Sequence, residues 1–246
     1  MDFRSVADDF FVNLSLQTTL ALPSNRETIL HFFEAVQKKF PSMTGFYQRA
    51  TDRFVLEGDR EAESYRWLEL QQHNLSAGHF NPASFEEACE LHQWLLDRSV
   101  YYLGASGLDV ESLDVLFGFN LNFIGNRDAI VAEAIYAGSG LGQLFANDAT
   151  LMECEPSIVV AIDEGCHMQA RLHLETHSAT YQVRTGQYDD EPISIYLTVR
   201  QYPRPGCVLD MKAAFARQVE LCESLSARIV VPHVVQAISA AIAASQ

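Results

Sequence analysis

Apolar and polar residues alternate along several stretches of the chain, with the period of two that a strand with one buried face requires. The first stretch covers residues 11–22, where valine and leucine at positions 12, 14 and 16 alternate with polar residues. A helix is expected over residues 26–40, because the apolar spacing lengthens there and Pro41 ends it. Further strands are expected over residues 44–50, 53–57 and 65–75, followed by a helix over residues 84–103.

The second half of the chain shows the same order with longer strands. The pattern predicts a strand over residues 113–124, a helix over 127–145, strands over 150–163, 168–184 and 192–202, and a helix from Asp210 onward. Between the halves, residues 104–109 are small and turn-forming, which is typical of a linker. We therefore expect two α+β units, at residues 1–104 and 108–246.

Two short segments support a tandem duplication. Residues 20–30 and 121–131 both contain the string Asn-Arg-acid-x-Ile-aliphatic at a strand-to-helix transition. Ser24 and Glu27 match a capping box, and Asn126 is expected to cap the second helix with Asp128 near its positive end. The repeated unit would be strand, helix, three strands, helix. A chance match over so short a window is the alternative.

Strands with one apolar face predict an antiparallel sheet that helices cover on one side, an α+β fold whose other face is open and polar. By topology alone, tandem units of this order resemble the saddle of the TATA-binding protein, but no residue motif supports that relationship. The resemblance adds a nucleic-acid-binding hypothesis, which predicts affinity that falls steeply with salt.

Charge argues against that hypothesis. The 246 residues contain 17 basic and 32 acidic side chains, a net charge of −15, which repels phosphate backbones and anionic membrane surfaces. The start of the chain lacks the charged-then-apolar run of a secretory signal, and the five cysteines contain no C-x-x-C pair. We therefore expect a cytoplasmic protein with free thiols, for which nucleic acid and membrane are poor partners.

The apolar end of the chain raises a separate question. Residues 227–246 are apolar but include Arg228, Pro232 and His233. Five aliphatic residues follow helical spacing, at positions 231, 234, 235, 238 and 242, which favours one buried stripe over a membrane span. We expect a docking helix, and the apolar helices would suit a homodimer interface.

The strand that begins at Met168 offers the most distinctive chemistry. At period two, one face carries Gln169, Arg171, His173, Glu175 and His177. Two imidazoles and a carboxylate suit a zinc or non-haem iron site, although one ion bound by all three would strain a straight strand. His173 and Glu175 with a third ligand from a neighbouring strand would fit such an ion better. The alternative is a solvated sheet face whose polar side chains pair across strands.

The strand near Ile193 is divided in the same way, with Tyr196 and Arg200 on its polar face. If the two strands pair, Gln169, Arg171, Tyr196 and Arg200 would form a ligand-binding surface able to hold a carboxylate or phosphate. Solvent exposure is again the alternative.

Familiar catalytic motifs are missing. The glycines at 138, 140 and 142 lack phosphate-loop spacing, and no G-x-S-x-G string occurs. Trp67 and Trp94 are expected in the core of the first half. The sequence favours a non-catalytic binding or assembly protein that meets a small ligand or protein partner through its polar sheet face. The alternative is a metal-assisted enzyme using the His-x-Glu-x-His strand. The sequence identifies no cofactor.

Overall fold

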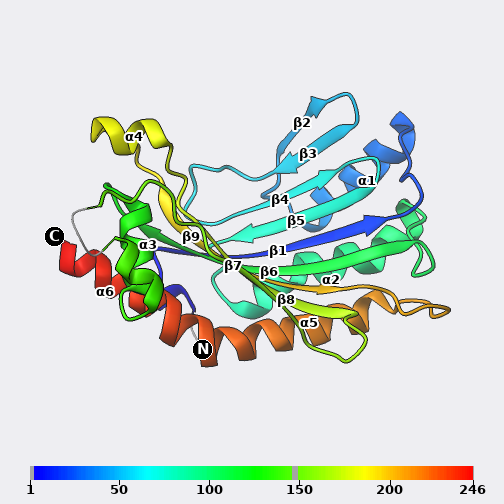
Figure 1. Ribbon diagram of the computed structural model, residues 1–246. Helices are drawn as coiled ribbons and strands as arrows, with labels where there is room; N and C mark the ends of the chain where they lie inside the picture. The colour runs from blue at the N-terminus through cyan, green and yellow to red at the C-terminus, as the bar shows by residue number, and fades with distance from the viewer. Residues whose placement is uncertain (1–2, 146–148, 246) are drawn as a thin grey trace.

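In the computed structural model the strands form one antiparallel sheet of nine, in the order β2-β3-β4-β5-β1-β6-β9-β8-β7 (Figure 1). The structure describes residues 3–145 and 149–245. The strands are β1 (Asp9–Thr18), β2 (Gly45–Ala50), β3 (Arg53–Glu57), β4 (Tyr65–Leu70), β5 (Asn74–Phe80), β6 (Val110–Asn122), β7 (Ser157–Ala161), β8 (Met168–Glu175) and β9 (Pro192–Gln201). The fold is therefore α+β, as the alternating patterns predict.

Helices connect the strands, and the longer ones pack against the buried face of the sheet (Figure 1). They are α1 (Arg26–Lys39), α2 (Phe85–Tyr102), α3 (Arg127–Tyr136), α4 (Thr180–Thr185), α5 (Met211–Leu225) and α6 (Gln236–Ser245), with short 3-10 turns at Phe3–Ser5 and Gly140–Leu144 and a π-helical segment at Ser226–Val235. In Figure 1, α2 and α5 lie side by side beneath β1 and β6.

The core lies between the sheet and these helices. Along β1, Val12, Leu14 and Leu16 are buried because they alternate onto the helix side, where Phe32 of α1 and Phe215 of α5 join the same apolar cluster. At roughly 25 cal/mol per Å² of apolar surface removed from water, burial on this scale is the dominant stabilising term.

The two halves share one sheet and one core. The central pair, β1 and β6, is antiparallel from Asp9 opposite Asn120 to Thr18 opposite Val110, with one register shift near the end of β1. The segment 104–109 is tied down, since Asp109 accepts hydrogen bonds from Thr19 Oγ1 (2.8 Å) and Leu20 N (2.7 Å). The linker therefore joins two parts of one continuous layer.

The repeated Asn-Arg-acid string begins a helix in both halves. Asn25 Oδ1 accepts from Thr28 N at 2.9 Å, and Asn126 Oδ1 accepts from Ala129 N at 3.1 Å. The predicted capping box from Ser24 is wrong, because Asn25 occupies the cap position. The two helices therefore begin with the same asparagine cap. The tandem duplication itself stays a prediction.

One predicted strand of the first half is a hairpin. Residues 65–75 form β4, a turn, and the start of β5, so this half has four strands after α1 and not three. The turn is closed by Gln71 N donating to Asn74 O at 2.8 Å. Leu70 and Leu75 both face the core but are five residues apart, so the alternation shifts phase at the turn. Residues 71–73 contain no glycine or proline that would mark the reversal.

Three predicted elements of the second half are too long. The helix from Arg127 ends at Tyr136, before the run of glycines, and continues only as a 3-10 turn. The strand predicted over 150–163 is reduced to Ser157–Ala161. The strand from Met168 ends at Glu175, and residues 180–185 form the short helix α4.

The end of the chain is helical and packs on α3. Val231, Val234, Val235 and Ile238 are buried and Ile242 packs against the core, so the predicted stripe is confirmed. By length and composition alone, Met211–Ser245 would also pass as a membrane span, which is weak evidence because core helices pass the same test.

Candidate functional site

The open face of the sheet carries its side chains in cross-strand rows, because the strands are paired in register. We name three neighbouring rows from β4 to β7. The aromatic row is Tyr65, Phe80, Phe11, Gly118, Tyr196, His173 and Ser157. The middle row is Trp67, Gly78, Asn13, Leu116, Thr198, Arg171 and Val159. The polar row is Glu69, Ser76, Ser15, Asp114, Arg200, Gln169 and Ala161.

Rings stack along the aromatic row. The ring centroids of Tyr65 and Phe80 are 5.2 Å apart, and those of Phe80 and Phe11 are 5.8 Å apart, both nearly parallel. Tyr196 meets Phe11 edge-on at 6.2 Å and stacks with His173 at the same spacing. Burial raises the pKa of Tyr196 above its ordinary value, so its hydroxyl stays a neutral hydrogen-bonding group. The row is an apolar ridge across six strands.

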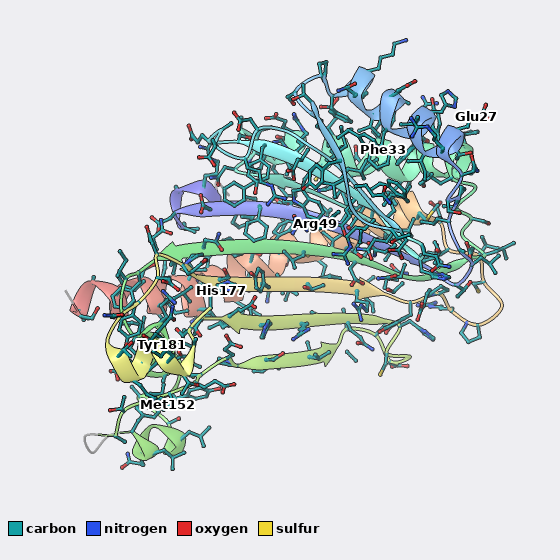
Figure 2. The ribbon with its side chains drawn as sticks, turned by 90° about the horizontal axis from the view of Figure 1, so that it is seen from above. Glu27, Phe33, Arg49, Met152, His177 and Tyr181 are labelled. Atoms are coloured by element: carbon teal, nitrogen blue, oxygen red, sulfur yellow. The ribbon has the colours of Figure 1, made fainter. Side chains whose placement is uncertain are left out.

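A hollow of about 630 Å³ lies beside this ridge, over the middle and polar rows. Most of its lining residues are polar, although apolar atoms make up the larger part of the lining surface. The residues come from seven strands: Asn13, Ser15, Trp67, Ser76, Asp114, Leu116, Ser157, Val159, Gln169, Arg171, Thr198 and Arg200, with Leu14 below. Figure 2 shows the strands from above, with side chains drawn along the sheet. The volume falls in the range of small-molecule sites.

The two arginines of the hollow have different surroundings. Arg200 is bound by Asp114, with Nε donating at 2.8 Å and Nη2 at 2.5 Å, and these hydrogen bonds raise the pKa of Arg200. Arg171 donates from Nε to Ser157 Oγ at 3.1 Å, and no acidic side chain within the described ranges forms an ion pair with it. Arg171 is therefore the guanidinium available to an anionic ligand.

Trp67 lies in the hollow rather than in the core, so its predicted role is wrong. It stands on β4 opposite Gly78, and a Cβ at Gly78 would lie 2.3 Å from Trp67 Nε1 and 2.2 Å from Asn13 Oδ1. Glycine is therefore required for these two side chains to meet over β5. Trp94 does pack in the helix layer, where its ring meets Phe40 edge-on at 6.0 Å.

The four predicted ligand-binding residues are neighbours. β8 pairs with β9, so Gln169 is opposite Arg200, and Arg171 lies between Gln169 and the pair formed by His173 and Tyr196. Gln169, Arg171 and Arg200 line the hollow, while Tyr196 belongs to the ridge beside it. The sequence analysis did not predict that β1, β4 and β5 also line the hollow. Their polar residues, including Asn13 and Ser15, complete the site.

The predicted metal ligands do not converge. Glu175 is the last residue of β8, and His177 leaves the strand with φ of 50°, which breaks the expected row. His173 stacks on Tyr196, whereas His177 Nδ1 is 3.9 Å from Glu175 Oε1. Across residues 3–145 and 149–245, no group of three His, Cys, Asp or Glu side chains has metal-binding geometry.

Near the end of β8, a glutamate, a histidine and a serine contact one another in that order. His177 Nε2 lies 3.1 Å from Ser194 Oγ, and Glu175 lies on the other side of the ring. The arrangement does not make a nucleophile, because Ser194 is buried and its hydroxyl donates to Asn120 Oδ1 at 2.8 Å. The serine proton is therefore held by the amide instead of being offered to the imidazole.

A buried arginine shapes the loop beyond β8. Arg127, on α3, is fully buried and donates to the carbonyl oxygens of Thr176 (2.6 Å), His177 (3.2 Å) and Asp189 (2.8 Å). Asp128 accepts from Thr176 Oγ1 at 3.0 Å. These contacts end β8 and hold the segment that contains His177 and Tyr181 (Figure 2).

No family model matches the chain, and no curated protein matches it with significant similarity.

Proposed function

We propose that this chain is a ligand-binding protein whose open-face hollow takes a small molecule with a flat apolar part and one anionic group. The observation that carries the proposal is Arg171, an exposed guanidinium with no ion-pair partner in the described ranges, at the edge of a hollow of about 630 Å³. The N–H donors of an arginine in an ion pair are already used by its acidic partner in the sheet. Arg171 retains donors for a carboxylate, sulfonate or phosphate.

The apolar part of the ligand would lie against the aromatic ridge. Tyr196 and His173 stack next to Arg171, so rings and guanidinium are within reach of one small molecule. Trp67 provides a second aromatic surface from β4. Aromatic faces bind flat apolar groups, and neutral hydroxyl and amide groups such as Ser15, Ser76 and Thr198 fix orientation without adding charge.

The charge of the molecule is compatible with an anionic ligand because Arg200 offsets Asp114 within the hollow. That ion pair leaves Arg171 as the local excess of positive charge, despite a net charge of −15 for the chain. The acidic surface would still slow the approach of anions at low salt, so moderate ionic strength should favour binding.

Anilinonaphthalene sulfonate tests the proposal because it combines fused rings with one sulfonate. We expect saturable binding with enhanced dye emission and energy transfer from Trp67. Arg171→Gln should weaken binding at least about tenfold, a loss of about 1.4 kcal/mol. Trp67→Phe should reduce the energy transfer.

The matched control is Arg26→Gln, which removes the same charge from an exposed position in the first turn of α1. It should leave dye affinity unchanged. If wild type binds no dye, or if both arginine variants bind it equally well, the hollow is not an anion-binding site and the proposal fails.

A further inference from the structure

We propose that the free edge of β7 binds an extended, basic segment of a partner protein, which adds to the sheet as a tenth strand. This site borders the hollow, whose lining includes the side chains of Ser157 and Val159, but it consists of backbone groups at the edge of the sheet. It is made by the backbone of residues 157–161, at the margin of the sheet opposite β2. In Figure 2 this strand is the outermost one of the sheet.

The backbone of β7 offers a complete set of hydrogen-bonding groups. Pro156 O accepts from Leu174 N at 3.0 Å, and Ile162 N donates to Met168 O at 2.8 Å, so the peptide groups of these residues point toward β8. With a period of two, Ile158 and Val160 point the same way. Ser157, Val159 and Ala161 must then direct their N–H and C=O groups outward, where they face solvent and are available to pair with another strand.

The side chains around this edge are apolar on both faces. Ile158 is 61% exposed, Val159 56% and Val160 49%. Ser157 to Ile162 contains no charged residue. Exposed β-branched residues on an unpaired edge are a pairing template, and soluble proteins usually protect such edges.

The other edge of the sheet is protected. β2 has an irregular register between Gln48 and Ala50, and Arg49 lies there, 3.8 Å from Glu69. A bulge and a charge both oppose edge pairing. The two edges therefore differ in the features that permit strand addition, and β7 has neither protection.

Charge indicates which strand would fit. Acidic residues flank the apolar stretch on both sides, Glu153 and Glu155 before it and Asp163 and Glu164 after it. Three of the four are exposed, and Asp163 lies 3.7 Å from Arg204. A partner strand with an apolar centre and Lys or Arg at both ends would complement this arrangement, and the net charge of −15 favours a basic partner.

A second copy of the chain fits less well. Antiparallel self-pairing about Val159 would set Glu155 of one copy against Asp163 of the other at both ends. Like charges that face each other across strands are destabilising. We therefore assign the edge to a basic segment of another protein.

The experiment uses the full chain and the peptide acetyl-Lys-Lys-Val-Thr-Val-Thr-Val-Lys-Lys-amide as the probe. We expect saturable binding that weakens as salt rises. Hydrogen exchange should slow at the outward amides of residues 157, 159 and 161, with little change at 158 and 160, which already face β8. Replacing every lysine of the probe by glutamate should abolish binding.

Val159→Pro removes one outward N–H group and should weaken binding at least about tenfold. Val159→Thr retains that group and controls for loss of the side chain. Glu153→Gln with Glu164→Gln should reduce the salt dependence. The proposal is overturned if the lysine probe does not bind, if it binds without protecting residues 157–161, or if sedimentation shows a dimer that Val159→Pro dissociates.

Discussion

The ring of Phe11 on β1 lies directly over Gly118 on β6, and a Cβ at Gly118 would lie 2.1 Å from Phe11 Cζ. This contact brings Phe11 toward Tyr196, so the aromatic ridge crosses β6 without a side chain from that strand. A central strand tolerates glycine poorly, and the close approach of the ring explains its presence here.

Gly118→Ala should therefore displace Phe11 and interrupt the ridge. Overpacking of this kind costs about 1–3 kcal/mol of unfolding free energy, and dye binding in the hollow should weaken as well. Urea unfolding and dye titration would measure the two effects. Gly140→Ala is the matched control, because no atom lies within 4 Å of its added Cβ. Equal stability of the two variants would contradict the expectation.

Arg127 should be among the most sensitive positions of the chain. Arg127→Met leaves several buried carbonyl oxygens without donors, and we expect a loss of about 3 kcal/mol or more with faster hydrogen exchange in residues 176–191. Arg26 occupies the matching position of the first helix but is exposed. Arg26→Met should leave the unfolding free energy within about 0.5 kcal/mol of wild type. A loss in Arg26→Met as large as that in Arg127→Met would contradict the expectation that burial makes Arg127 the more sensitive position.

Asp114 should control how much positive charge the hollow presents. Asp114→Asn removes the carboxylate that binds Arg200, so the guanidinium becomes available and affinity for anilinonaphthalene sulfonate should rise about threefold or more. The gain should shrink as salt is added. Asp97→Asn removes one acidic charge from an exposed pair with Lys212 and should not change affinity. A decrease in affinity for Asp114→Asn would show that the ion pair itself is needed.

Stability should fall on mild acidification because of buried histidines. Burial lowers the pKa of His92 from 6.5 to about 4, and His92 Nε2 lies 3.0 Å from Val12 O. Near pH 6.5, His92 therefore becomes protonated in the unfolded chain but stays neutral in the folded chain. The contribution of neutral His92 to the free energy of unfolding is fully present above pH 6.5 and is lost progressively toward pH 4. The slope is up to about 1.4 kcal/mol per pH unit for each such histidine.

The pKa of His79 is lowered to about 4 mainly by burial, so it should add to the same slope. Urea unfolding across this pH window measures it. His92→Gln should flatten the slope, whereas His31→Gln, at an exposed position on α1, should not. An unchanged slope in His92→Gln would mean that His92 is already protonated in the fold.

The halves of the chain should not fold separately. Without residues 1–104, β6 would lose its partner β1, and Phe117 and Phe119 would lose their edge contacts with Phe3. We expect residues 105–246 alone to aggregate or remain unfolded. Circular dichroism and sedimentation would check this, and a folded monomeric fragment would instead establish two independent domains.

Much of the fold follows from local pattern. Alternation identified β3 and β9 closely and β1 to within four residues, and the Asn-Arg-acid strings placed the starts of α1 and α3. The hairpin between β4 and β5 was missed because its turn, residues 71–73, contains no glycine or proline. The early end of β8 was missed because its cause, Arg127, lies far away in the chain.

The sequence by itself determined the α+β class, the polar faces of β8 and β9, the buried stripe of the last helix and the acidic charge, since each depends on periodicity or composition alone. Only the tertiary structure decided that the two halves form one sheet and that Trp67 lies in a hollow. It also decided that, among the residues it describes, Arg200 forms an ion pair and Arg171 does not, and that β7 is an edge strand. These properties depend on which residues face each other across strands, and that register is set by long-range packing that no local pattern encodes.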